Sequence, residues 1–495
     1  IQIGFRDVCI KDGQLMVNGQ PVLIKGANRH EMNPYKGYIV SEADMIQDIQ
    51  IMKQLNINAV RTCHYPDDPL WYSLCDRYGL YVVAEANIES HGMGYGDATL
   101  AKDPAYELAH LERIRRAVQR DRNHPSVIIW SLGNEAGYGP NFVKSYEAVK
   151  AIDPLRPVHY ERAEGAPHTD VISIMYSDPA WCERYSLSDH ERPLILCEYA
   201  HAMENSLGNF QEYMDDFEAH EHMCGGYIWD FVDQAIRKKT PDGDQWLYGT
   251  DFEQYEPGRY THLPNTTAMT GSNTYFNANG IITADRKPHP SYFEVKKVYC
   301  EIKVKERDLE KGEFTLINKK LFTDLADFEF KWSLQAEGIE VQSGTLDINC
   351  GPLSQVDFTI PYDLASLPEK ECVLIISFLN KTAHPWCEAG YEQGFDQFIV
   401  KEAKPEEKAI DGTVTFVKKE NAVFVNGENF SVKIDGGKIT SLKYDGKEYL
   451  KAAVTPNYFR ALTDNDFSNL NFIPFLLPFT PYLNWQRATK GAKGT

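Results

Sequence analysis

The chain has 495 residues, 43% of them hydrophobic and 25% charged, and this length predicts roughly two to four domains. Its 71 acidic residues outnumber 51 basic ones, for a formal net charge of −20. This argues against a nucleic-acid partner, because phosphate binding needs a surface rich in lysine and arginine. No apolar run reaches the roughly 20 residues that a membrane-spanning helix needs, so no membrane partner is expected either.

The ten cysteines are scattered, without a C-x-x-C pair. We interpret them as small buried apolar residues, and as neither a zinc site nor a disulfide framework. The sequence opens IQIGFRDVCI, with no initiator methionine and no signal-peptide pattern. We therefore expect an excised piece whose native N-terminus is absent, which leaves cytoplasmic and periplasmic locations both open.

Apolar runs of strand length alternate with helix-like segments before residue 300. Residues 41–55 show helical periodicity behind a serine N-cap, and residues 105–123 and 206–219 repeat the pattern. The predicted strands are residues 22–28, 58–64, 80–89, 127–135, 158–161, 171–176, 194–198 and 225–230. Eight βα units in about 280 residues predict an α/β fold, a (β/α)8 TIM barrel over residues 1–300, with a doubly wound sheet as the alternative.

The pattern changes after Tyr299. Residues 301–402 carry short alternating runs broken by Gly, Pro and Asn, which predict an immunoglobulin-like, all-β sandwich. Residues 401–408 are charged and contain a proline, as a linker would. Residues 411–495 are β-rich, with a predicted hairpin around Gly436-Gly437. We expect an incomplete C-terminal β domain there.

Polar side chains gather where the predicted strands end. Barrel enzymes place their reactive groups at these ends, and buried charges are tolerated chiefly at functional sites. The candidates are His30, Arg61, His64, Glu89, His91, Asn134, Glu135, Tyr176, Glu198, His201, Trp229 and Asp230. Taken alone, Glu198 is equally well explained as a solvated charge or as a partner for a nearby arginine. A core aromatic residue is the alternative for Trp229.

Two of these candidates, Glu135 and Glu198, follow the fourth and seventh predicted strands. Two carboxyl groups that face one opening suit glycoside hydrolysis, in which one protonates the leaving oxygen while the other attacks the anomeric carbon or activates water. Trp229 would offer an apolar face to the C–H surface of a sugar. The residues alone therefore favour a glycosidase.

Five motifs then carry a resemblance to a known family. They are TCHYPDDPLW at 62–71, IESHGM at 88–93, RNHPS at 122–126, SLGNEA at 131–136 and LCEYAHAM at 196–203. Together they resemble glycoside hydrolase family 2, specifically its large bacterial β-galactosidases. The resemblance covers nearly the whole chain, as far as RALTDND at 460–466.

The resemblance implies a retaining double displacement that releases terminal β-D-galactose. In it, Glu198 would be the nucleophile and Glu135 the general acid and then base. Arg61 and Tyr176 would keep Glu198 ionised. The positions that resemble galactose contacts of the family are His30, His64, Asn134, His201 and Trp229.

The resemblance also implies two metal ions. Glu89, His91 and Glu135 match a Mg²⁺ site, for which the residues alone give a weak signal because magnesium prefers oxygen ligands. The main-chain oxygen of Phe276 and the side chain of Asn279 match a site for Na⁺ (or K⁺). A homo-oligomer is expected for the full-length form.

Two features depart from the family pattern. Glu204 stands where relatives commonly have glycine, and the N-terminal sandwich domains, one of which supplies an aspartate to the sodium site, are not in this sequence. We therefore expect this piece to be a poorer catalyst than a longer chain. The alternatives are a sibling β-glycosidase acting on glucuronides or mannosides, and a non-catalytic sugar-binding module.

Overall fold

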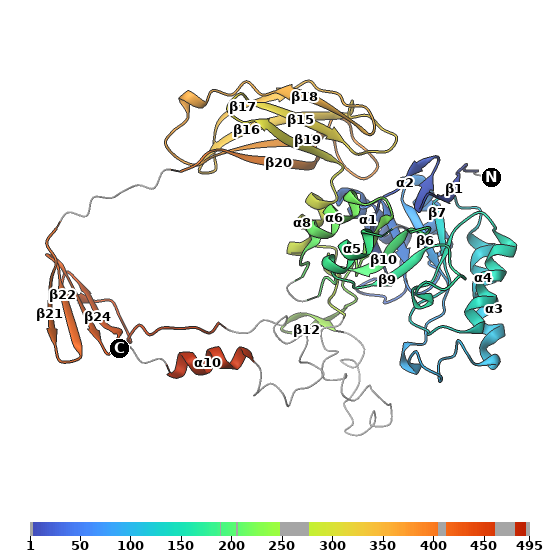
Figure 1. The fold of residues 1–495 in the computed structure, drawn as a ribbon, viewed down its shortest axis with the longest axis horizontal. Helices are drawn as coiled ribbons and strands as arrows, with labels where there is room; N and C mark the ends of the chain where they lie inside the picture. The colour runs from blue at the N-terminus through green and yellow to red at the C-terminus, as the bar shows by residue number, and fades with distance from the viewer. Residues whose placement is uncertain are drawn as a thin grey trace. The chain divides into compact units, whose positions relative to one another are not determined.

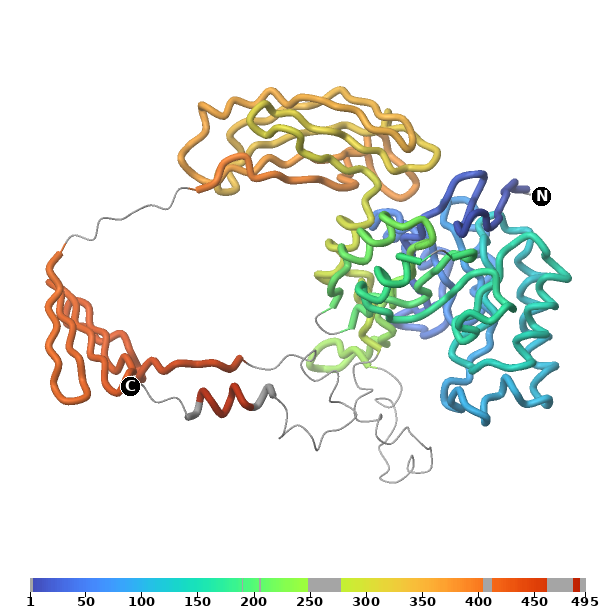
Figure 2. Tube along the Cα trace, viewed as in Figure 1, coloured from blue at the N-terminus to red at the C-terminus, as the bar shows by residue number. Residues whose placement is uncertain are grey.

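The structure is a computed structural model that describes residues 3–188, 190–203, 206–247, 277–403, 412–460 and 481–491. It divides into two compact units, residues 1–403 and 404–495. The tube in Figure 2 follows the first unit from its blue and green segments into its yellow and orange strands.

Eight parallel strands form the centre of the first unit, in the order β8-β7-β6-β5-β4-β11-β10-β9. Their bounds are β4 Ile24–Arg29, β5 Ala59–Thr62, β6 Tyr81–Glu85, β7 Val127–Ser131, β8 Val158–His159, β9 Ile172–Met175, β10 Leu194–Tyr199 and β11 Met223–Ile228. The first of these, β4, pairs with the last, β11. A backbone hydrogen bond from Asp170 to Val158 (2.8 Å) links the two end strands. The barrel prediction is confirmed and the doubly wound alternative is wrong.

The barrel helices lie outside these strands (Figure 1). They are α1 Glu42–Gln54, α2 Pro69–Tyr78, α3 Glu107–Asp121, α4 Pro140–Ile152, α5 Pro179–Ser186, α6 Phe210–Ala219 and α8 Pro290–Val298. The predicted start of α1 is confirmed, because Ser41 and Asp44 form a reciprocal capping box. Strands β7 and β10 are buried along their whole length, as a parallel sheet covered on both faces requires.

Several predicted boundaries were wrong. Helix α6 begins at Phe210 and not at residue 206, because Asn209 has left-handed backbone (φ 56°) that a helix cannot continue through. Strand β6 ends at Glu85 and β8 at His159, four and two residues before their predicted ends. Helix α10, Pro481–Gly491, lies where only β structure was expected.

A small antiparallel sheet closes the amino end of the barrel. It consists of β1 Val8–Lys11, β2 Gln14–Val17 and β3 Gln20–Pro21. Leu15 and Val17 of β2 share one apolar cluster with Ile129 and Ile195 of the barrel strands. The floor of the barrel is therefore filled, and the opposite, carboxyl end is left for polar side chains.

The strands expected in residues 301–402 form two antiparallel sheets, β14-β15-β18 and β17-β16-β19-β20. Their bounds are β14 Ile302–Asp308, β15 Glu313–Asn318, β16 Phe328–Ala336, β17 Ile339–Leu346, β18 Ser354–Thr359, β19 Cys372–Asn380 and β20 Glu392–Lys401. Alternate residues of β16 and β19 are buried, and both sheets contribute to one apolar core. This is the predicted sandwich.

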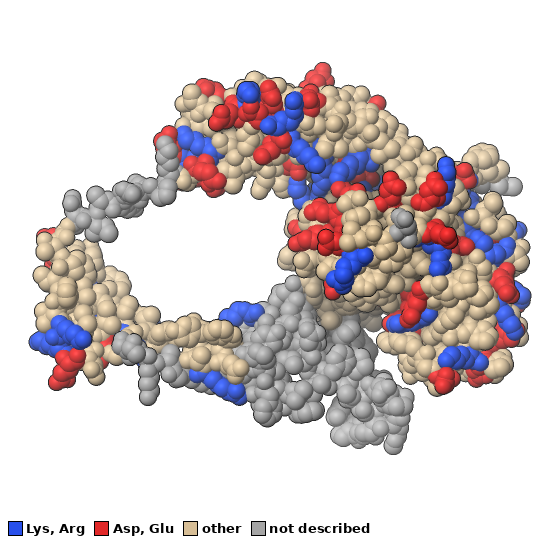
Figure 3. All heavy atoms as spheres, in the orientation of Figure 1, with Lys and Arg blue, Asp and Glu red and all other residues tan. Residues whose placement is uncertain are grey.

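Acidic and basic side chains are intermingled on the face of the molecule shown in Figure 3.

The second unit holds a five-stranded antiparallel sheet, in the order β21-β22-β23-β24-β25. Its strands are β21 Thr415–Lys419, β22 Ala422–Asn426, β23 Phe430–Asp435, β24 Lys438–Tyr444 and β25 Lys447–Glu448. The predicted hairpin is confirmed, since Gly436 and Gly437 turn between β23 and β24 with positive φ. Most of the predicted linker lies outside the described residues. No helix among the described residues is long and apolar enough to cross a membrane.

Candidate active site

Glu198 is the second-last residue of strand β10, and its side chain is 5% exposed. Arg61, on β5, donates from Nη1 to its Oε1 (2.9 Å). Tyr176, just after β9, donates from its hydroxyl to Oε2 (2.7 Å). Burial of the hydroxyl and the charge of Glu198 raise the pKa of Tyr176 well above its usual value, so it remains a donor. Each oxygen of Glu198 thus has a fixed donor.

Arg61 is completely buried and connects several strand ends. Besides Glu198, it donates to Asn28 Oδ1 on β4 (2.8 Å) and to Glu85 Oε2 on β6 (2.8 Å). It also donates from Nη2 to Asn134 Oδ1 (2.9 Å), next to Glu135. Burial alone would lower the pKa of Arg61, but the surrounding negative charges raise it well above the usual value. A permanent cation therefore sits beneath Glu198.

Glu85 was not among the predicted site residues. It is fully buried, and it accepts hydrogen bonds from Arg61 and from Ser131 Oγ (2.6 Å), while His64 Nδ1 lies 2.8 Å from its other oxygen. Burial alone would raise the pKa of Glu85, but Arg61 and His64 hold it at about 2. Glu85 shows the same sequence pattern as the predicted site residues, a glutamate at the end of an apolar run. It was missed because the predicted strand continued to Glu89, whereas β6 ends at Glu85.

Glu135 has a more open environment than Glu198. Its side chain is 21% exposed, and its backbone has positive φ (38°). Tyr95 donates to Oε1 (2.8 Å), as does Arg162 Nη2 (3.1 Å). His91 Nδ1 lies 3.2 Å from Oε2. Three side chains from two loops therefore orient this carboxyl group, and none of them is deeply buried.

Glu161 is a second residue that the sequence analysis missed. It follows β8, is 4% exposed, and accepts the backbone N–H of Glu135 at Oε1 (2.7 Å). Burial raises the pKa of Glu161 to about 8, although Arg162 beside it acts in the opposite direction. Glu161 is the last residue of the predicted strand 158–161, and this position at a strand end could have marked it as a candidate site residue.

The predicted sugar-binding side chains lie around the same opening. Trp229 is partly exposed, so it is not a core aromatic residue; its ring stacks on His64 (5.2 Å between centroids, 11°) and meets His30 edge-on (5.4 Å). His201 lies beside Tyr176 (5.7 Å). Burial lowers the pKa of His201 to about 4, which keeps this imidazole neutral near pH 7.

One predicted metal cluster is assembled and the other is partly described. Donor atoms of Glu89, His91 and Glu135 lie within 4.8 Å of one another. Asn279 is 3% exposed. Its backbone carbonyl accepts the backbone N–H of Asp230 (2.8 Å), which lies just after β11, the eighth barrel strand. Phe276 and Glu204 lie outside the described residues.

Comparison with known families agrees with this geometry. Residues 8–304 match the family model for glycosyl hydrolases family 2, TIM barrel domain. Residues 314–401 match β-galactosidase, domain 4, and residues 426–493 match the β-galactosidase small chain. The chain belongs to glycosyl hydrolase family 2.

Curated relatives named β-galactosidase match 94% of this chain. One, from Priestia megaterium, is 39% identical over 488 residues, covering 94% of this chain and 46% of the relative. Another, from Photobacterium profundum, is 39% identical over 499 residues with the same coverage. The chain thus spans about half the length of these relatives. A solved GH2 β-galacturonidase from Eisenbergiella tayi aligns with 60% of this chain and 54% of its own, with 23% identity and a TM-score of 0.47.

Proposed function

We propose that this chain carries the catalytic centre of a retaining β-galactosidase, which releases terminal β-D-galactose from β-galactosides. The proposal draws on the family and on the names of the curated relatives. The observation that carries it is the contrast between two glutamates at one barrel mouth. Glu198 is buried between fixed donors, whereas Glu135 is open to water.

Glu198 acts as the nucleophile. Arg61 and Tyr176 each donate a hydrogen bond to one carboxylate oxygen, which fixes the group at the end of a buried strand. It attacks the anomeric carbon to form a covalent glycosyl-enzyme. The buried strand end serves as a rigid support for this carboxylate, since loops hold such a position less accurately.

Glu135 protonates the departing oxygen and then deprotonates the attacking water. Its exposure lets it exchange protons with solvent between the two steps, while Tyr95 and Arg162 keep it oriented. We expect the two carboxyl groups to be about 5–5.5 Å apart, as retention of configuration requires. Asn134 links the two glutamates through Arg61. It precedes Glu135 in the chain, and its side-chain oxygen accepts a hydrogen bond from the same Arg61 that binds Glu198.

The sugar would occupy the opening lined by His30, His64 and Trp229. The indole face suits the C–H surface of galactose. Asn134 and the neutral His201 would hydrogen-bond its hydroxyl groups. Because His64, on which Trp229 stacks, lies beside Glu198 (Nε2 to Oε1, 3.8 Å), a sugar bound there would present its anomeric carbon to the nucleophile.

Glu89, His91 and Glu135 fit a hard cation such as Mg²⁺, since two carboxylates and one imidazole converge there and waters would complete the shell. Such an ion would lower the proton affinity of Glu135. We also propose Na⁺ or K⁺ at Phe276 and Asn279, a homo-oligomeric full-length form, and domains at residues 1–300, 301–402 and 411–495.

Nitrophenyl β-galactoside, β-glucuronide and β-mannoside, assayed side by side, test the substrate. We expect hydrolysis of the galactoside at a kcat/KM well above that of the other two. Proton NMR of the galactoside reaction should show β-galactose before α-galactose. Preference for the glucuronide or mannoside would replace the proposed substrate, and α-galactose as the first product would contradict the double displacement.

A further inference from the structure

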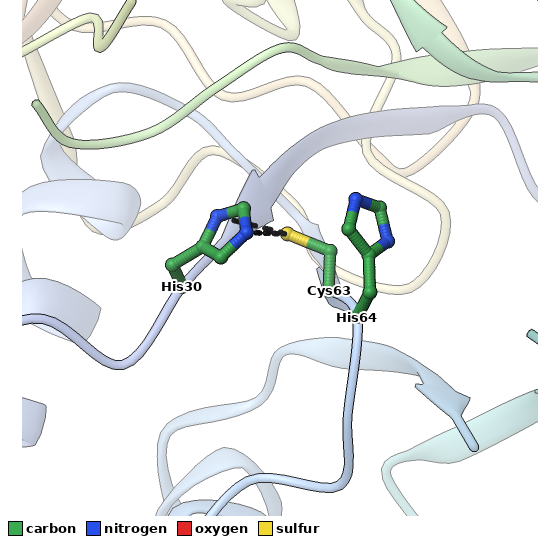
Figure 4. Close-up of side chains that lie close together, drawn as sticks. All are labelled: His30, Cys63 and His64. Atoms are coloured by element: carbon green, nitrogen blue, oxygen red, sulfur yellow. Dashed lines mark hydrogen bonds between the residues drawn. The ribbon is translucent and has the colours of Figure 1, made fainter. Parts of the chain in front are cut away.

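A group of soft metal ligands lies at the carboxyl ends of β4 and β5. His30 follows β4, while Cys63 and His64 follow β5. The Sγ atom of Cys63 is 3.3 Å from Nδ1 of His30. One donor atom from each of the three residues lies within 4.8 Å of the others, and Figure 4 shows the thiol between the two imidazoles.

We propose that His30, Cys63 and His64 form a binding site for a thiophilic divalent cation of the zinc class. A thiolate and two imidazoles are the ligand set that such cations prefer, whereas Mg²⁺ selects oxygen. Zn–S and Zn–N bonds of about 2.3 and 2.0 Å place tetrahedral donors roughly 3.3–3.7 Å apart. The Cys63–His30 pair already has this separation, and His64 needs a modest side-chain movement to match it.

The groups around the cluster support a bound cation. His64 Nδ1 lies 2.8 Å from Glu85 Oε1; a carboxylate partner of this kind orients metal-binding histidines and leaves the other nitrogen to the ion. The His30 Nδ1 atom that faces Cys63 lies 3.5 Å from Asp230 Oδ2, so a cation bound at Nδ1 would lie close to this carboxyl group. Cys63 interacts electrostatically with three carboxyl groups, those of Glu85, Glu198 and Asp230, and with one guanidinium group, that of Arg61. The local balance of charge is therefore negative.

Binding is an exchange of a proton for a metal ion. The Cys63 side chain is completely buried. A cation that reaches Sγ from the open side, where His30 and His64 are partly exposed, forms the Sγ–metal bond while the thiol proton leaves to solvent.

Occupation of this site would block the sugar. His30 and His64 are proposed galactose contacts, so this part of the inference rests on the proposed function. The cation should behave as a competitive inhibitor of galactoside hydrolysis, distinct from Mg²⁺ at Glu89, His91 and Glu135. Cys63 has no role in the proposed reaction, and its removal should separate inhibition from catalysis.

Cobalt(II) titration tests the site without reference to activity. A sulfur-to-cobalt charge-transfer band should develop up to one equivalent, because a thiolate is available here and not in the cluster of Glu89, His91 and Glu135. Cys63→Ser and Cys63→Ala should lose the band. Cys9→Ser, which removes an exposed thiol, is the matched control and should keep it. A band that persists without Cys63 overturns the proposal.

Two further measurements complete the test. X-ray absorption of the unsubstituted chain with one equivalent of Zn²⁺ should show one sulfur at about 2.3 Å and two nitrogens at about 2.0 Å; a shell of oxygen alone overturns the site even if no Cys63 variant folds. With Mg²⁺ in excess, Zn²⁺ should inhibit competitively, and Cys63→Ser should raise the inhibition constant at least tenfold. Non-competitive inhibition would overturn the overlap with the sugar, and absence of galactoside hydrolysis would instead overturn the proposed function while the cobalt result stands.

Discussion

The carboxyl ends of β10 and β7 hold their glutamates in opposite ways. Glu198 is buried, lies within a strand, and is bound by a permanent cation and a tyrosine. Glu135 is partly exposed, has left-handed backbone, and is held by side chains that water also reaches. A group that must stay charged benefits from fixed burial with paired donors, whereas a group that must exchange protons needs access to solvent.

The largest effect is expected for Glu198→Gln. The amide cannot form the glycosyl-enzyme, so kcat should fall by a factor on the order of 10⁴ or more. A 2-fluoro-galactoside inactivator should label a peptide that contains Glu198 in the unsubstituted protein. Label on any other carboxylate would refute the assignment, and circular dichroism of the variant should show that the fold is intact.

Glu135→Gln should give a loss that depends on the leaving group. Galactosides with poor leaving groups should lose about 10²–10⁴ in rate, because they need protonation, while activated aryl galactosides should lose much less. Azide should restore turnover by replacing the water that Glu135 activates, with β-galactosyl azide as the product. Equal losses for all leaving groups would contradict the role.

Replacing Glu85 tests whether the ionised groups beneath Glu198 stabilise the fold. The pKa of Glu85, about 2, lies below the usual 4.5. Its contribution to the free energy of unfolding is therefore present above about pH 4.5 and is lost as the pH falls towards 2. That contribution is about 3 kcal/mol. We expect Glu85→Gln to lower the free energy of unfolding by about this amount at pH 7, with the difference shrinking in acid.

Urea unfolding across this pH range provides the measurement for Glu85. Glu112→Gln is the control, because Glu112 forms an exposed pair with Arg116 and should change stability by less than about 1 kcal/mol. A deficit for Glu85→Gln that stays constant from neutral to acid pH would show that ionisation is not its source.

Tyr176→Phe removes one donor to Glu198 and leaves Arg61 in place. A hydrogen bond to a charged group contributes about 1.5–3 kcal/mol, which corresponds to a roughly ten- to hundredfold loss in kcat/KM. Tyr146→Phe is the matched control, since Tyr146 donates to Asp170 (2.9 Å) away from the mouth. Equal losses in both variants would point to a general effect on stability.

Chelation is expected to have the smallest effect. A cation bound by Glu89, His91 and Glu135 would place positive charge beside Glu135, so its removal should shift the acid–base limb of the pH–rate profile to higher pH. Glu89→Gln should reproduce the shift and reduce its sensitivity to chelator. An unchanged profile would leave Glu89 and His91 as hydrogen-bonding neighbours of Glu135.

The sequence predicted the barrel well because its strands are continuous apolar runs that end in polar residues. It predicted strand ends less well, since apolar residues continue past the last paired position. That is why Glu89 was chosen as a site residue while Glu85, the residue that meets Arg61, was passed over. Periodicity carries no information on which of two nearby glutamates faces inward.

Other site features depend on the three-dimensional arrangement alone. Arg162 reaches Glu135 from the segment after β8, and no local motif indicates this contact. His30 and Cys63 are 33 residues apart and meet because β4 and β5 are neighbours in the barrel. Cysteine spacing carries no information on such a cluster, because its members meet only in the folded barrel.

The sandwich is attached to the barrel through a partly buried ion pair. Lys25 of β4 binds Glu301, just before β14, at 2.6 Å, and Gln393 of β20 donates to Asn56 beyond α1 (2.6 Å). Burial alone would raise the pKa of Glu301, but Lys25 and Lys320 hold it at about 2. Separating the two parts would break this ion pair and this hydrogen bond at the same time. Heating should therefore melt barrel and sandwich together, as a single calorimetric endotherm.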